Sequence, residues 1–185
     1  NSLGEPQLGQ GGMVVSDNQN ASWIAVYHLN LGVDHEGNAI ISTVDQRTGS
    51  VWEVYAYKVG PDGSMYWGAD GLALTASSAS NMSPRLAVTN ENNVIVAWTH
   101  NDNTVLFQHI SSSGTLLWGD GILVTDNDAT LISPNPIITS DNNILIQWIR
   151  QTGPFWAANS ELYLQKYDHD GSALWNDPVV AAGPV

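Results

Sequence analysis

The stretch SPRLAVTNENNVIVAW (residues 83–98) aligns without a gap with SPNPIITSDNNILIQW (residues 133–148), which begins 50 residues later. A second set of matching segments aligns on Trp67, Trp118 and Trp175, each preceded by a turn that contains glycine. Self-similarity at a fixed period of 20 to 50 residues is typical of repeat architectures. The two matching stretches therefore determine the expected organisation of the chain.

A more divergent copy of the first half, GVDHEGNAIISTV, begins at Gly32 and lacks the strand tryptophan. The chain thus contains three repeats of about fifty residues. We expect one domain over residues 9–185, with repeats at about 12–75, 76–125 and 126–181, after an N-terminal tail at 1–8.

Each repeat is predicted to form four short strands, because its apolar residues alternate and glycine or asparagine turns separate the runs. In the middle copy the strands are expected at 85–89, 93–100, 104–111 and 116–125. We predict an all-β, β-propeller-like array of three four-stranded antiparallel blades; a β-sandwich is the alternative. Closed propellers have about four to eight blades, so the array is predicted to be a fragment of a larger propeller or half of a six-bladed dimer.

Composition limits the partners. Five lysines and arginines stand against 18 acidic residues, giving a net charge of −13. Binding to nucleic acids or to anionic membranes requires clustered cationic side chains, so both are disfavoured as partners. Neutral glycans, cationic peptides and calcium remain possible ligands. No apolar run approaches the roughly 18 residues that span a bilayer, and no cysteine is available for a disulfide or a thiolate.

The segment LQKYDHDGSALW (residues 164–175) resembles the propeller-type repeats of large secreted and surface proteins of Bacteroidetes and related bacteria. Its turn also resembles the Asp-box of sialidases and related propellers, although the spacing from Gly171 to Trp175 is one residue longer. The resemblance implies a propeller fold and a secreted or cell-surface location. The resemblance implies no particular activity, because the family has no single activity in common. The Asp-box implies only a structural turn, since it lies far from the catalytic site in the proteins that contain it.

Two loops depart from the regular repeat. Residues 48–52 (TGSVW) and 152–156 (TGPFW) share a Thr-Gly-x-apolar-Trp pattern and lengthen the connection between the second and third strands. An exposed tryptophan there can stack on a sugar ring or a partner side chain; alternatively, each packs on its own hairpin. The candidate ligand-binding residues are Trp52, Trp156, Arg47 and Arg150.

No catalytic residue is predicted. The five histidines lack metal-ligand spacing, no nucleophile motif occurs, and most acids lie in turns, where they cap the backbone. A sialidase-type site would need clustered arginines, and only three are scattered over the repeats. No cofactor is expected except a structural calcium, for which Asp168 and Asp170 are weak candidates.

The sequence therefore predicts a non-catalytic, secreted or cell-surface bacterial module, not an enzyme, that binds a carbohydrate or protein ligand. The alternatives are an architectural spacer of a larger exoprotein and, less favoured, a glycoside hydrolase. A homodimer or further blades of a longer chain are the expected partners that would complete the ring.

Overall fold

A computed structural model describes residues 6, 8–16, 30–49, 51–75 and 79–183. Residues 17–29 of the first expected repeat, Ser50 of the first tryptophan loop and most of the expected tail lie outside the described residues. Within the described part, no helix has the length and apolarity needed to cross a membrane.

The described strands form three antiparallel sheets of four strands each. The first sheet contains β1 (Asn30–Val33), β2 (Ala39–Asp45), β3 (Glu53–Val59) and β4 (Leu72–Ala73). The second contains β5 (Asn81–Val88), β6 (Val94–His100), β7 (Thr104–Ile110) and β8 (Ile122–Thr125). The third contains β9 (Thr130–Ile138), β10 (Ile144–Thr152), β11 (Asn159–Tyr167) and β12 (Val179–Ala182), with the short 3-10 helix η1 (Phe155–Ala157) between β10 and β11.

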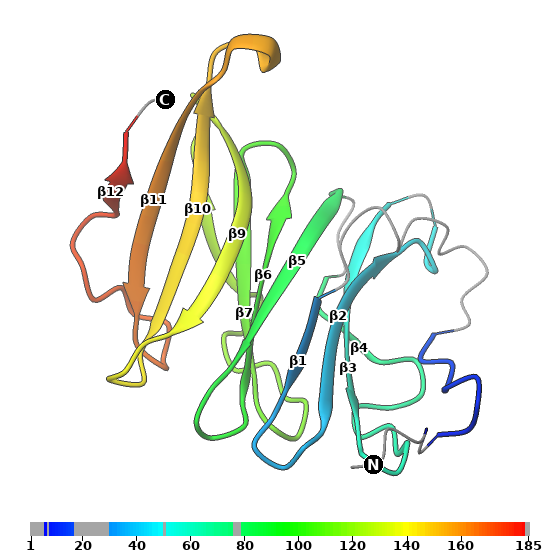
Figure 1. The fold of residues 1–185 in the computed structure, drawn as a ribbon. Helices are drawn as coiled ribbons and strands as arrows, with labels where there is room; N and C mark the ends of the chain where they lie inside the picture. Colours follow the sequence, from blue (N-terminus) through cyan, green and yellow to red (C-terminus); the bar gives the residue numbers. More distant parts are fainter. Residues whose placement is uncertain (1–5, 7, 17–29, 50, 76–78, 184–185) are drawn as a thin grey trace.

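The sheets stand side by side in sequence order, and each runs from its first strand to its fourth in chain order (Figure 1). The first strands β1, β5 and β9 neighbour one another across the three sheets. This is the arrangement of consecutive propeller blades, in which each first strand faces a common axis. The predicted fold class is confirmed, and the three sheets form a partial propeller.

The turns between the first and second strands are tight, as their sequences predict. Asn92 and Asn142 both adopt a φ of 61°, and Gly37 occupies the matching turn of the first sheet with a φ of 82°. Asparagine tolerates this left-handed conformation better than other non-glycine residues, which explains why it recurs there.

The fourth strand of the second sheet is shorter than predicted. In the second sheet β8 begins at Ile122 instead of Leu116, which forms only an isolated bridge with Ile110. Between them, Gly119 and Gly121 adopt φ values of 59° and 92°, which turn the backbone out of the extended conformation.

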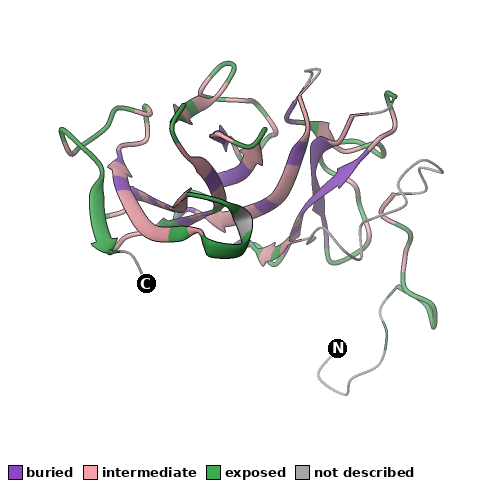
Figure 2. Ribbon diagram, turned by 90° about the horizontal axis from the view of Figure 1, so that it is seen from above, coloured by how far each residue is buried: buried purple, intermediate pink, exposed green. Residues whose placement is uncertain are grey.

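Most of the apolar core lies in two layers between neighbouring sheets, and a third, smaller cluster is centred on Tyr55, Tyr57 and Val59 of β3; buried residues are purple in Figure 2. Trp98 fills the layer between the first and second sheets, and Trp148 fills the layer between the second and third; they are 0% and 2% exposed. A single blade leaves its faces exposed to water, so stacking is what buries them.

The turn tryptophans connect each blade to the next. The Trp67 indole N–H donates to the carbonyl of Ser112 at 3.3 Å, and that of Trp118 donates to His169 at 2.9 Å. Trp118 and Trp175 are both half-buried, but Trp118 packs on the core layer between the second and third sheets, whereas no further turn in the described part of the chain packs on Trp175.

Candidate functional site

The two tryptophan loops emerge at the same end of the array, which is the upper edge in Figure 1, with the second sheet between them. Trp156 lies in η1 and is 85% exposed. Trp52 is half-buried and packs against the core layer between the first two sheets, while its carbonyl accepts the Asn81 backbone N–H at 3.1 Å. Only Trp156 thus has the exposure that we expected of both.

Arg47 is held inside its own blade. Its Nε lies 3.0 Å from each carboxylate oxygen of Asp45, its Nη2 donates to the Tyr57 hydroxyl at 2.6 Å, and the guanidinium lies 3.7 Å from the centre of the Tyr55 ring. Burial acts to lower the Arg47 pKa, but the hydrogen bonds to Asp45 and Tyr57 outweigh it and raise the pKa. Arg47 therefore stabilises the first sheet and does not converge with Arg150.

Arg150 lies between two carboxylates that sequence inspection did not single out as a pair. Its Nε donates to Asp126 Oδ2 at 2.6 Å and its Nη1 donates to Glu161 Oε2 at 3.3 Å. Glu161 is directly opposite Arg150 on β11, and Asp126 lies on the linker between β8 and β9. All three side chains are about a quarter exposed, so the cluster faces solvent beside the loop that carries Trp156.

The charge state of this cluster follows from its hydrogen bonds. Arg150 lowers the Asp126 pKa, with a further hydrogen bond from the backbone of Asp128. Asp126 is thus held as a carboxylate. Glu161 could be recognised as the partner of Arg150 only from the strand register of the β10–β11 hairpin, which places the two residues opposite each other. The sequence alone does not give this register.

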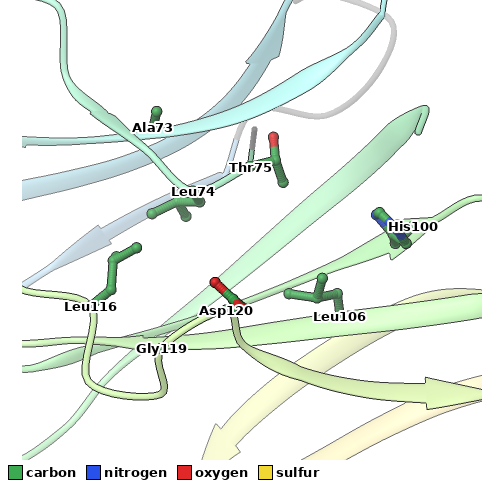
Figure 3. Close-up of a pocket in the computed structure, with 8 residues that line it drawn as sticks. All are labelled: Ala73, Leu74, Thr75, His100, Leu106, Leu116, Gly119 and Asp120. Carbon is green, nitrogen blue, oxygen red and sulfur yellow. The ribbon is translucent and has the colours of Figure 1, made fainter. Parts of the chain in front are cut away.

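A cavity of about 360 Å³ lies between the first two blades and is lined by residues of both (Figure 3). Leu74, Leu106 and Leu116 form apolar walls, while His100 and Asp120 supply polar groups at its edge. His100 Nδ1 lies 2.8 Å from Asn81 Oδ1, and burial lowers the His100 pKa. Apolar walls with a few polar groups suit a small ligand. The lining contains one carboxylate, whereas glycoside cleavage by carboxylates requires two.

The two calcium candidates lie in the turn between β11 and β12. Asp168 Oδ1 accepts the backbone N–H groups of Asp170 at 3.0 Å and Ser172 at 2.8 Å, so Asp168 caps this turn. Among the residues that the structure describes, no three His, Cys, Asp or Glu side chains are grouped so that they could hold a metal ion.

Comparison with known proteins finds similarity in structure only. No protein family model matches the chain, and no curated protein matches its sequence. Among solved structures, the chain is similar to an endo-arabinase from Bacteroides thetaiotaomicron, with 13% identity and a TM-score of 0.53, covering 85% of this chain and 74% of that one. It is also similar to a thermostable family-43 glycoside hydrolase, with 16% identity and a TM-score of 0.52, covering 86% of this chain and 53% of the other.

These similarities support the propeller fold implied by the sequence resemblance, and they give no support for the Asp-box or for a Bacteroidetes origin. They contradict our prediction of a non-catalytic module that is not an enzyme, because both solved structures are glycoside-cleaving enzymes. That prediction rested on the lack of a catalytic motif, and carboxylates that meet only in the folded chain leave no such motif. A carbohydrate ligand, which we also predicted, agrees with both similar structures.

Proposed function

We propose that this chain forms part of the propeller of a glycoside hydrolase that acts on a neutral glycan. The observation that carries the proposal is the pair Asp126 and Glu161, held on either side of the Arg150 guanidinium at the edge where Trp156 is exposed. Most glycoside hydrolases use two carboxyl groups flanking the scissile bond, one as acid and one as base or nucleophile.

The geometry favours different roles for the two carboxyl groups. Asp126 accepts the shorter hydrogen bond, at 2.6 Å, and its lowered pKa suits a base or nucleophile, which must be ionised. Glu161, 3.3 Å from Arg150 on its other side, is the second carboxyl group of the pair and is assigned the remaining role, that of the acid, as part of the proposal. Trp156, on the loop joining β10 and β11, offers a flat apolar surface for stacking on a sugar ring.

The net charge of −13 supports an uncharged substrate, since an acidic polysaccharide would be repelled. Arabinan is the first substrate to test, because one of the similar structures is an endo-arabinase. A secreted or cell-surface location, implied by the sequence resemblance, fits a polymeric substrate that does not cross membranes and is part of the proposal. A homodimer or further blades would complete the ring around such a substrate.

The test measures reducing ends released from arabinan and from other neutral glycans by the whole chain. Asp126→Asn and Glu161→Gln are each expected to lower kcat about 100-fold or more, the usual contribution of general acid–base catalysis. Asp128→Asn is the matched control, because Asp128 lies on the same linker and contacts Asp126 through its backbone N–H. Trp156→Ala is expected to raise KM more than it lowers kcat.

Two results would overturn the proposal. One is a folded wild-type chain that releases no reducing ends from any glycan tested. The other is hydrolysis that continues unchanged in both Asp126→Asn and Glu161→Gln, which would assign the cluster a structural role.

A further inference from the structure

A second cavity, of about 540 Å³, lies between the second and third blades, at the end of the array opposite Arg150. It is the lower edge in Figure 1, where the turns between the first and second strands lie. Two carboxylates line it, Glu91 from the β5–β6 turn and Asp170 from the β11–β12 connection. His109 of β7 and Asn142 of the β9–β10 turn also line it, as does His169, whose ring centroid lies 5.9 Å from that of His109.

The repeat provides a direct comparison, because the first two blades enclose the equivalent cavity, of about 340 Å³. Glu36, which precedes Gly37, matches Glu91, which precedes Asn92. Ser113 matches Asp170, because each precedes the glycine of its turn. The position of His109 is occupied by Lys58, whose ammonium lies 2.9 Å from Asp34 Oδ2. The first cavity thus contains a lysine ammonium, which the second lacks.

The third blade repeats the pattern. Lys166 of β11 stands at the position of Lys58 and His109, and its ammonium lies 2.6 Å from Asp141, which matches Glu91. In two of three repeats, therefore, a lysine ammonium neutralises an acidic group beside the first turn. In the second repeat histidine replaces lysine, and Asp170 adds a further carboxylate.

The cavity also contains acceptors without partners. His109 Nδ1 lies 3.1 Å from the His169 carbonyl, which can only accept, so Nδ1 must carry the proton. Burial lowers the His109 pKa and favours the neutral ring, in which Nε2 is an acceptor. His109 is 2% exposed, and its Nε2 and the Asn142 Oδ1 have no hydrogen-bond partner among the described residues. Buried polar atoms of this kind call for a partner.

Apart from the His169 ring, the groups named above that lack a partner accept hydrogen bonds or carry negative charge. Asn142 Nδ2 donates to Glu91 Oε1 at 2.6 Å, which fixes the amide so that its oxygen is left over. Burial acts to raise the Glu91 pKa, but hydrogen bonds involving Thr89 and Asn142 outweigh it and lower the pKa, so Glu91 is ionised. The complement of such a lining is a ligand that carries both positive charge and N–H donors.

We propose that the cavity between the second and third blades is a binding site for a primary ammonium group, which occupies the place taken by a lysine ammonium in the other repeats. The site is separate from the Arg150 cluster and does not depend on the proposed hydrolase activity. The described residues contain no group of three side chains suited to a metal, which favours an organic cation. The ammonium can belong to a small amine or to the lysine of a peptide.

The experiment is calorimetric titration of the whole chain at pH 8, where imidazoles are neutral, with n-butylammonium chloride, Nα-acetyl-lysine methylamide and uncharged n-butanol. Both amines are expected to bind saturably and n-butanol not to bind. Stronger binding of the lysine derivative would indicate a peptide ligand, and equal binding would indicate that the ammonium alone is recognised. Glu91→Gln is expected to weaken binding about tenfold or more, because a hydrogen bond to a charged group is lost.

His109→Lys is the most specific variant, since it restores the residue of the other two repeats and supplies the ammonium internally. It is expected to abolish amine binding. Glu36→Gln, in the equivalent cavity that contains Lys58, is the matched control and should leave binding unchanged. Equal binding of n-butanol and butylammonium, or full binding by folded Glu91→Gln, would overturn the proposal; since Glu91 is exposed, that variant should fold.

Discussion

The contact between Gly114 and Trp67 allows a quantitative test of how the blades are joined. Gly114 has a φ of +92°, and a Cβ added to it would lie 2.9 Å from Trp67 Cδ1 and 3.3 Å from its Nε1. Gly68 has almost the same φ, +90°, but an added Cβ would meet nothing within 4 Å. The two glycines therefore share the backbone strain of a substitution and differ in the contact with the next blade.

Gly114→Ala and Gly68→Ala should each lower the free energy of unfolding by about 1–3 kcal/mol, because alanine is unfavourable in this backbone conformation. Gly114→Ala should lose about 1–3 kcal/mol more, because the methyl group overpacks the interface and displaces the Trp67 ring from its hydrogen bond to Ser112. With a urea m-value of about 2 kcal/mol/M, the two midpoints should differ by about 0.5–1.5 M.

The assay is urea unfolding of both variants and the wild type, followed by circular dichroism. Equal midpoints for Gly114→Ala and Gly68→Ala would refute the claim that close packing of the turn on Trp67 holds the blades together. Placing Gly114→Ala in a Trp67→Leu background should remove most of the extra loss, because the clashing ring is then absent.

Three further outcomes follow from buried polar groups. Lys58→Met should lower the free energy of unfolding, measured by thermal denaturation, by about 3–5 kcal/mol, because it leaves the fully buried Asp34 carboxylate without its cation. Burial acts to raise the Asp34 pKa, but hydrogen bonds from Asn38 and Lys58 outweigh it and lower the pKa to about 2. The stability from Asp34 should thus be complete above about pH 4 and be lost as the pH falls towards 2, and Asp34→Asn should flatten this loss in acid titrations. Asn81→Ala should cost about 2–4 kcal/mol by chemical denaturation, because the Asn81 amide accepts from the Trp98 indole and donates to two carbonyls; an unchanged midpoint would show that water replaces it.

The residues of the candidate site differ in how far their positions follow from the sequence. The pattern of the two tryptophan loops identified Trp156, which is exposed, but gave the same expectation for Trp52, which packs on the core. Local sequence cannot separate these outcomes, because they depend on whether a neighbouring blade offers an apolar surface. The pairing of Asp126 with Glu161 through Arg150 joins residues from a linker and two strands, so no motif marks it.

The repeat, the four-stranded unit and its turns can all be predicted from the order of residues along the chain. Asn92, Asn142 and Gly114 mark backbone conformations that few residues adopt, and such local preferences can be recognised from residue type and spacing. Tertiary structure alone decided which groups meet between blades. The replacement of Lys58 by His109 is visible in an alignment of the repeats, yet its consequence appears only when the Asp170 turn of the next blade closes the cavity. Charges and donors act over a few ångströms in space, and stacking the blades brings together residues about sixty positions apart in the chain.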